Sequence, residues 1–117
     1  MKKIIIFLFF FISFNTYASE INLEKIIDGL DSPWSLSFID SENIIFTEKS
    51  GNLYKLNLKD KSILKIKHNL SVLEIGQGGL LDVLYDDGQI YISYSENRGD
   101  WKTSTSVAKG KFNNAKI

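Results

Sequence analysis

Short runs in which apolar and polar residues alternate follow one another along the chain, separated by polar turns. Alternation places every second side chain on one face, the pattern of a half-buried β-strand. The expected strands span residues 34–39, 44–48, 53–58, 63–68, 80–85, 89–95 and 104–112. The pattern restarts after the fourth strand, since Leu36 aligns with Leu81 at an offset of 45 and Ile44 with Ile90 at an offset of 46. Repeats of roughly 40–50 residues are typical of β-propeller blades, so we expect an all-β chain with about two blades.

The first residues have the composition of a targeting segment rather than of a folded domain. Met1, Lys2 and Lys3 form a basic head, and residues 4–14 are apolar except for one serine. We interpret residues 1–18 as a signal peptide cleaved after Ala18, leaving a domain over residues 19–117. An uncleaved anchor is the alternative, but eleven residues reach only about 16 Å across a hydrocarbon core of about 30 Å. We expect a periplasmic or secreted protein with no other membrane span.

Charge and cysteine content exclude several classes of function. The chain carries 14 basic and 14 acidic side chains, and without Lys2 and Lys3 the formal charge becomes −2. This balance gives no attraction to nucleic acid or to an anionic membrane surface. The chain has no cysteine, so it has no disulfide bonds and no thiolate zinc site.

A glycine-rich segment over residues 74–82, Glu-Ile-Gly-Gln-Gly-Gly-Leu-Leu-Asp, lies where the second group of strands begins. Its three glycines allow backbone conformations and close approaches that side chains would block. Gln77 stands between them and is therefore presented from a tight turn at the head of a strand. Such a position suits a residue that faces a cleft, although a plain turn with an exposed amide is the alternative.

The same segment resembles part of the glucose/sorbosone dehydrogenase family, the soluble quinoprotein sugar dehydrogenases. Residues 29–38, 47–51 and 91–95 resemble the same family in the same order, so the resemblance covers most of residues 25–110. It implies a six-bladed propeller that uses pyrroloquinoline quinone (PQQ) and calcium. It also implies oxidation of the C1 hydroxyl of aldose sugars to lactones, with electrons passed to a separate acceptor.

The resemblance assigns one site residue. Gln77 matches the glutamine that lies at the family's cofactor pocket, so we assign it to PQQ binding; its amide can donate and accept hydrogen bonds. The family's catalytic histidine, its basic cofactor contacts and its calcium ligands lie beyond the matched region. No catalytic residue and no metal ligand is therefore assigned in this chain.

The other chemically notable residues have structural interpretations. His68, the single imidazole, is expected to be a surface or hydrogen-bonded strand residue, and Asp82 a partnered structural carboxylate. Asp86 and Asp87 are expected to form a hairpin turn with the glycine that follows. Trp34 is expected in the core between blades, whereas Trp101 is left open between a substrate-side rim and loop packing.

Two further segments have structural predictions. Glu48 and Lys49 are expected to serve strand and turn geometry, and a role near the cofactor pocket is the minority alternative. Residues 20–27 are expected to be an extended strand that helps to close the propeller ring, although one helical turn is possible.

Two blades alone leave large apolar faces uncovered, because propeller blades bury their faces against neighbours. We therefore interpret the chain as the N-terminal fragment of a quinoprotein dehydrogenase, marginally stable in isolation. A two-blade protein that oligomerises into a ring is the alternative. A non-catalytic propeller binding module and an inactive gene remnant are the competing functional hypotheses.

Overall fold

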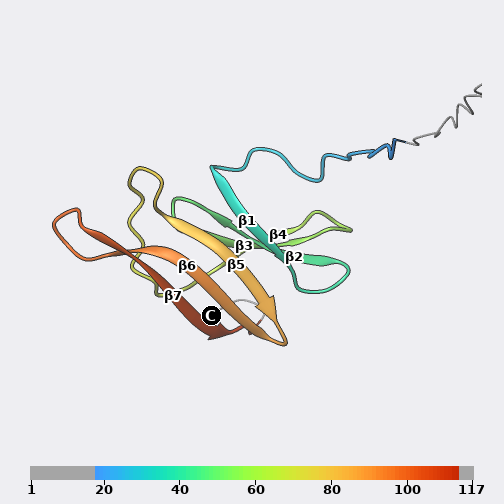
Figure 1. Cartoon of the computed structure of the whole chain (residues 1–117). Coiled ribbons are helices and arrows are strands. Elements are labelled where there is room, and N and C mark those ends of the chain that lie inside the picture. The colour runs from blue at the N-terminus through green and yellow to red at the C-terminus, as the bar shows by residue number, and fades with distance from the viewer. Residues whose placement is uncertain (1–17, 114–117) are drawn as a thin grey trace, which may run out of the picture.

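The computed structural model describes residues 18–113, which fold into two antiparallel β-sheets (Figure 1). The predicted signal peptide over residues 1–18 lies outside the described residues except for Ala18. The first sheet has the order β1-β2-β3-β4, with bounds Pro33–Phe38, Asn43–Glu48, Asn52–Asn57 and Ile63–Ile66. The second sheet has the order β5-β6-β7, with bounds Leu80–Asp86, Gln89–Asn97 and Thr103–Lys111. Within residues 18–113, no helix has the length and apolar character needed to cross a membrane.

All seven strands lie where the alternation predicts them, within a few residues at the ends. β4 is shorter than predicted, because the chain leaves the sheet after Ile66. β6 is longer, because its pairing with β7 continues to Asn97 opposite Thr103. The all-β prediction and the division into a four-stranded and a three-stranded unit are confirmed.

The main hydrophobic core lies between the two sheets. Ile45 and Leu53 of the first sheet are fully buried there, beside Ile66. From the second sheet come five buried apolar residues: Leu80, Val83, Ile90, Ile92 and Tyr94. Because successive residues of a strand face opposite sides, Ile44, Phe46 and Leu56 form a separate cluster on the outer face of the first sheet. Both faces of the first sheet are thus apolar, as in a propeller blade.

The strands β1 and β5 join the two sheets through hydroxyl groups. Ser35 Oγ donates a hydrogen bond to Asp82 Oδ1, and Tyr85 N–H donates to Ser37 Oγ at 3.0 Å. Thr47 Oγ1, which is fully buried, donates to the carbonyl oxygen of Leu81 at 2.6 Å. The contacts advance together along both strands, so β1 and β5 run parallel to each other. This is the relation expected of the inner strands of neighbouring blades.

The structure corrects the predicted offset of the first strand in the repeat. β1 carries a register shift between Pro33 and Leu36, and β5 carries one between Leu80 and Val83. The two irregularities differ by 47 positions, not by 45. A slip of two residues leaves the same side chains on the same face, so the apolar pattern alone cannot detect it.

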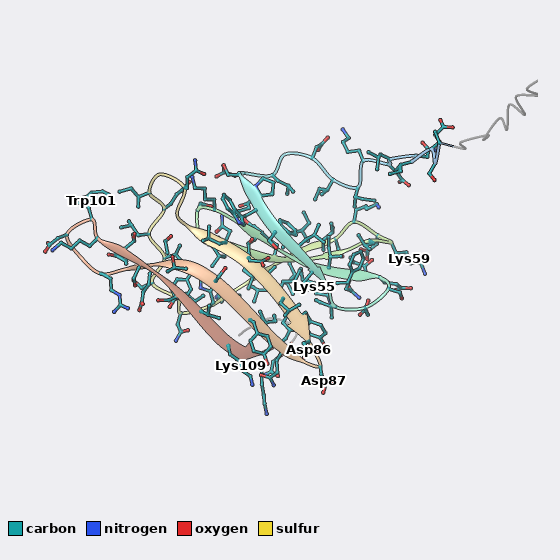
Figure 2. The ribbon with its side chains drawn as sticks, in the orientation of Figure 1. Lys55, Lys59, Asp86, Asp87, Trp101 and Lys109 are labelled. Carbon is teal, nitrogen blue, oxygen red and sulfur yellow. The ribbon has the colours of Figure 1, made fainter. Side chains whose placement is uncertain are left out.

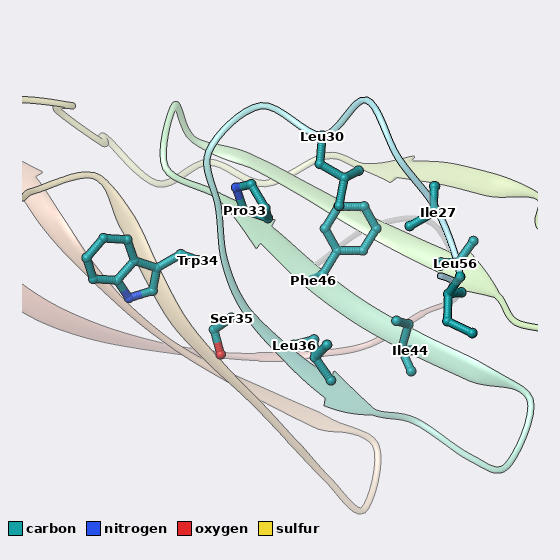
Figure 3. Close-up of a pocket in the computed structure, with 10 residues that line it drawn as sticks. Ile27, Leu30, Pro33, Trp34, Ser35, Leu36, Ile44, Phe46 and Leu56 are labelled. Atoms are coloured by element: carbon teal, nitrogen blue, oxygen red, sulfur yellow. The ribbon is translucent and has the colours of Figure 1, made fainter. Parts of the chain in front are cut away.

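The prediction places Trp34 in the core between blades, and the core between the two described sheets does not contain it. Its side chain is 48% exposed, because the neighbouring Ser35 is the residue that faces β5. Figure 3 shows Trp34 directed away from Leu30 and Phe46, which line the same hollow of about 310 Å³ on the outer face of the first sheet.

The prediction that residues 20–27 form a strand closing the propeller ring stays a prediction, because the two described sheets do not form a ring. This segment has no regular secondary structure, and no described strand pairs with it. Instead, Ile27 and Leu30 pack against the cluster of Ile44, Phe46 and Leu56.

Candidate functional site

The glycine-rich segment forms a tight turn that displays Gln77. The Gly78 N–H donates to the Ile75 carbonyl oxygen at 2.8 Å, which closes a four-residue turn. Gly76 occupies the first central position with a φ of 55°, a conformation that strongly favours glycine. Gln77 occupies the second central position and is exposed. The structure therefore confirms that Gln77 stands at the tip of a turn just before β5.

The base of this turn is fixed by Lys49. The Leu80 N–H donates to the Lys49 carbonyl oxygen at 3.0 Å, and the Ser95 N–H donates to the Gly79 carbonyl oxygen at 2.8 Å. Lys49 Nζ also donates to the carbonyl oxygen of Gly76. Lys49 thus holds the segment at Gly76 and at Leu80, and Ser95 holds it at Gly79. The prediction that this lysine serves turn geometry is confirmed, but only the structure shows that the turn is the one carrying Gln77.

Gln77 has the properties of a residue available to a ligand. Its amide makes no hydrogen bond to any of residues 18–113. No heavy atom lies within 4 Å of the position a Cβ would take on Gly76, so one side of the turn is open. The turn therefore combines a fixed base with an open tip, on which a flat polar ligand could contact both the amide and the backbone.

Three loops gather at the end of the sheets where β5 begins. They are the turn with Gln77, the turn after β2 with Lys49, and the loop of residues 98–102 between β6 and β7. Figure 2 shows Trp101 in the last loop, far from Asp86 and Asp87 at the opposite end of the second sheet. At the end where β5 begins, the guanidinium of Arg98 pairs with the Glu96 carboxylate at 2.9 Å, so the positive charge of Arg98 is already neutralised.

Glu48 is a buried carboxylate at the same end and is only 5% exposed. Its Oε1 accepts the Asp31 N–H at 2.8 Å, and its Oε2 accepts Asn52 Nδ2 at 3.0 Å. These contacts tie the chain before β1 to the start of β3. Burial raises the pKa of Tyr54, and the negative charges of Glu48 and Asp31 raise it further. Glu48 is therefore a structural residue, as the sequence predicts.

His68 and Asp82 also have structural partners. His68 Nδ1 accepts the Leu70 N–H at 3.2 Å, which leaves Nε2 to donate to the Gly51 carbonyl oxygen at 2.8 Å. Both ring nitrogens of the imidazole are thereby occupied. Asp82 Oδ1 accepts the Val83 N–H at 2.9 Å in addition to the hydroxyl of Ser35. The predictions of a hydrogen-bonded histidine and a partnered carboxylate are confirmed.

Asp86 and Asp87 form the hairpin between β5 and β6, as predicted. Asp87 has a φ of 43° and is followed by a glycine with a φ of 77°, the paired positive values of a type I′ turn. No group of three or more histidine, cysteine, aspartate or glutamate residues in the described range 18–113 is arranged to hold a metal ion.

Two consecutive antiparallel sheets that pack face to face around a shared core define a class of protein, the β-propeller, of which they form neighbouring blades. Residues 30–117 match the family described as Glucose / Sorbosone dehydrogenase. The chain belongs to the glucose/sorbosone dehydrogenase family. The matched region contains both sheets, Lys49 and Gln77.

A curated relative supports this assignment. The aldose sugar dehydrogenase YliI of Escherichia coli strain K12 is 33% identical over 98 residues, which cover 79% of this chain and 26% of the relative. The chain thus spans about a quarter of the length of that protein.

Solved structures show the same fold. A glucose dehydrogenase superimposes with a TM-score of 0.74 at 32% identity, covering 80% of this chain and 30% of that chain. The soluble aldose sugar dehydrogenase of Escherichia coli in its apo-form gives a TM-score of 0.72 at 31% identity, covering 80% and 29%. The PQQ-bound aldose sugar dehydrogenase of Streptomyces coelicolor gives 0.68 at 16% identity, covering 79% and 28%, which shows the fold alone.

Proposed function

We propose that this chain is part of an exported PQQ-dependent oxidoreductase that converts aldose sugars to lactones, and that Gln77 contacts the PQQ. The observation that carries the proposal is the turn of residues 75–78, which lies inside the family match and presents an unengaged amide from a fixed base. The chain spans only part of each relative, so the activity, the sugar and the electron acceptor are proposed for the whole protein.

The described residues fit a planar, polar cofactor at this turn. Gln77 can donate from its amide nitrogen to the carbonyl and carboxylate oxygens of such a ligand, and its amide oxygen can accept from a ring N–H group. The open side of Gly76 leaves room for such a ligand to approach the backbone. When bound, PQQ supplies the hydride-accepting chemistry, which protein side chains do not provide. The contribution of Gln77 is to bind and orient.

The proposed calcium ligands and the base that removes the sugar hydroxyl proton belong to other parts of the protein. His68 does not serve as that base, because both of its ring nitrogens bind the backbone. A general base must reach the proton that it abstracts, and this imidazole is committed elsewhere.

The test is a titration of PQQ into the complete protein and into its Gln77→Ala variant. Binding is measured from the absorbance of the bound quinone. We expect the variant to bind PQQ about tenfold more weakly, the effect of losing one well-placed hydrogen bond in a desolvated site. Gln77→Asn keeps the amide but shortens its reach, and we expect an intermediate affinity. Unchanged affinity in Gln77→Ala would remove Gln77 from the cofactor site.

A further inference from the structure

A hollow of about 370 Å³ lies beside Trp101 and is separate from the turn of Gln77. Its lining residues come from two loops: Leu73, Asn97, Gly99, Asp100 and Trp101. The two loops are held together by backbone hydrogen bonds, from Leu73 N–H to the Ser95 carbonyl oxygen at 3.0 Å and from Asn97 N–H to the Ser71 carbonyl oxygen at 2.8 Å. The hollow is therefore a feature of two joined segments rather than of one loose loop.

Trp101 is displayed to solvent in an unfavourable backbone conformation. Its side chain is 78% exposed, and its φ is 59°, following a φ of 47° at Asp100. Positive φ at a bulky residue is a conformational outlier, and such outliers concentrate at ligand sites. The loop is closed by hydrogen bonds between Arg98 and Lys102 and between Lys102 and Gly99, each 2.8 Å long. The loop thus holds the indole ring of Trp101 in solvent. Burial of this ring does not compensate for the unfavourable backbone conformation of the residue.

The polar groups around the hollow complement the indole face. The Asp100 carboxylate accepts no hydrogen bond from residues 18–113. Asn97 Oδ1 accepts the Gly99 N–H at 2.9 Å, which leaves its amide nitrogen free to donate. The guanidinium of Arg98 is bound to Glu96 and to Ser104. The hollow therefore presents one flat apolar surface, one carboxylate acceptor and one amide donor.

We propose that this hollow is a saccharide-binding site in which a pyranose ring stacks on Trp101. A pyranose has a flat face of C–H groups that packs on an indole, and a rim of hydroxyls that both donate and accept. Asp100 accepts from one hydroxyl and Asn97 donates to another. An organic cation would also suit an indole beside a carboxylate. The choice of a sugar over a cation rests on the proposed function.

Trp34 is the other tryptophan of residues 1–117, so Trp101 can be observed alone when this 117-residue chain carries Trp34→Phe. In a Trp34→Phe background of the full chain, we expect added maltose to change the emission of Trp101 saturably, with a dissociation constant on the order of 1 mM. Calorimetry should show maltose binding weakened about tenfold or more by Trp101→Ala and several-fold by Asp100→Asn. Circular dichroism should stay unchanged, because Trp101 is exposed.

Each alternative gives a distinct result. No change of emission with maltose, or equal affinity in Trp101→Ala, would overturn the proposal. A response to choline without a response to maltose would identify a cation site instead, and a response to protein concentration alone would identify a contact between copies of the chain. PQQ is absent from these titrations, so their failure leaves the assignment of Gln77 untouched. Conversely, a failed PQQ titration with intact maltose binding would overturn only the proposed function.

Discussion

The space around Gly79 is too small for any side chain. We expect Gly79→Ala to disrupt the turn that presents Gln77. A Cβ on Gly79 would lie 2.7 Å from Lys49 Cγ and 3.0 Å from the Lys49 carbonyl carbon, and closer still to the carbonyl oxygen. Two of these atoms belong to backbone that is fixed by the hydrogen bond to Leu80. The contact therefore cannot be relieved by rotating a side chain.

Two costs add in Gly79→Ala. The φ of 156° at this position is one that side chains rarely adopt, which costs about 1–3 kcal/mol. Forcing extra volume into a packed contact costs about 1–3 kcal/mol more. We expect a loss of about 4 kcal/mol in the free energy of unfolding, most of the stability of a small domain near 5 kcal/mol.

Gly76→Ala is the matched control from the same turn. Gly76 also has a positive φ, of 55°, but nothing lies within 4 Å of its added Cβ. Only the backbone cost applies, and we expect a loss of about 1 kcal/mol. Urea denaturation followed by tryptophan fluorescence measures both variants. Similar losses for the two variants would refute the close contact between Gly79 and Lys49.

Two further predictions concern the connection between the sheets and a turn outside the site. Asp82→Ala removes the carboxylate that accepts from Ser35 across the sheets, and thermal denaturation should show a loss of about 1 kcal/mol; a loss as large in Asp86→Ala would contradict a specific role. Hydrogen bonds from the Glu42 N–H and from the side chain and N–H of Asn43 lower the pKa of Asp40 below 3.8, so its stabilisation is present above that value and is lost as the pH falls through the lowered pKa. Urea midpoints should therefore fall less between pH 7 and pH 3 in Asp40→Asn than in the unchanged chain, and equal falls would contradict this.

The strands could be predicted from the sequence because alternation is a local property. The residues of one strand are enough to show which of its side chains share a face. The turn at Asp87 is likewise determined by residues adjacent in the sequence. The exposure of Gln77 was predictable for the same reason, since the glycines on both sides of it set the turn.

Contacts between residues far apart in the sequence could not be predicted in this way. The bond from Lys49 to Gly76 and the hollow beside Trp101 each join two loops, and no local pattern specifies them. The absence of Trp34 from the core between the two sheets could not be predicted, because it depends on which neighbour, Trp34 or Ser35, faces β5. That choice is set by the irregular register at the start of β1.

The central claim is that the turn held by Lys49 presents Gln77 to PQQ. The most direct measurement is a crystal structure of the complete protein with PQQ bound. The account predicts the Gln77 amide within hydrogen-bonding distance of the cofactor, with the turn in the conformation described above. A cofactor bound elsewhere, with the Gln77 amide in solvent, would contradict it.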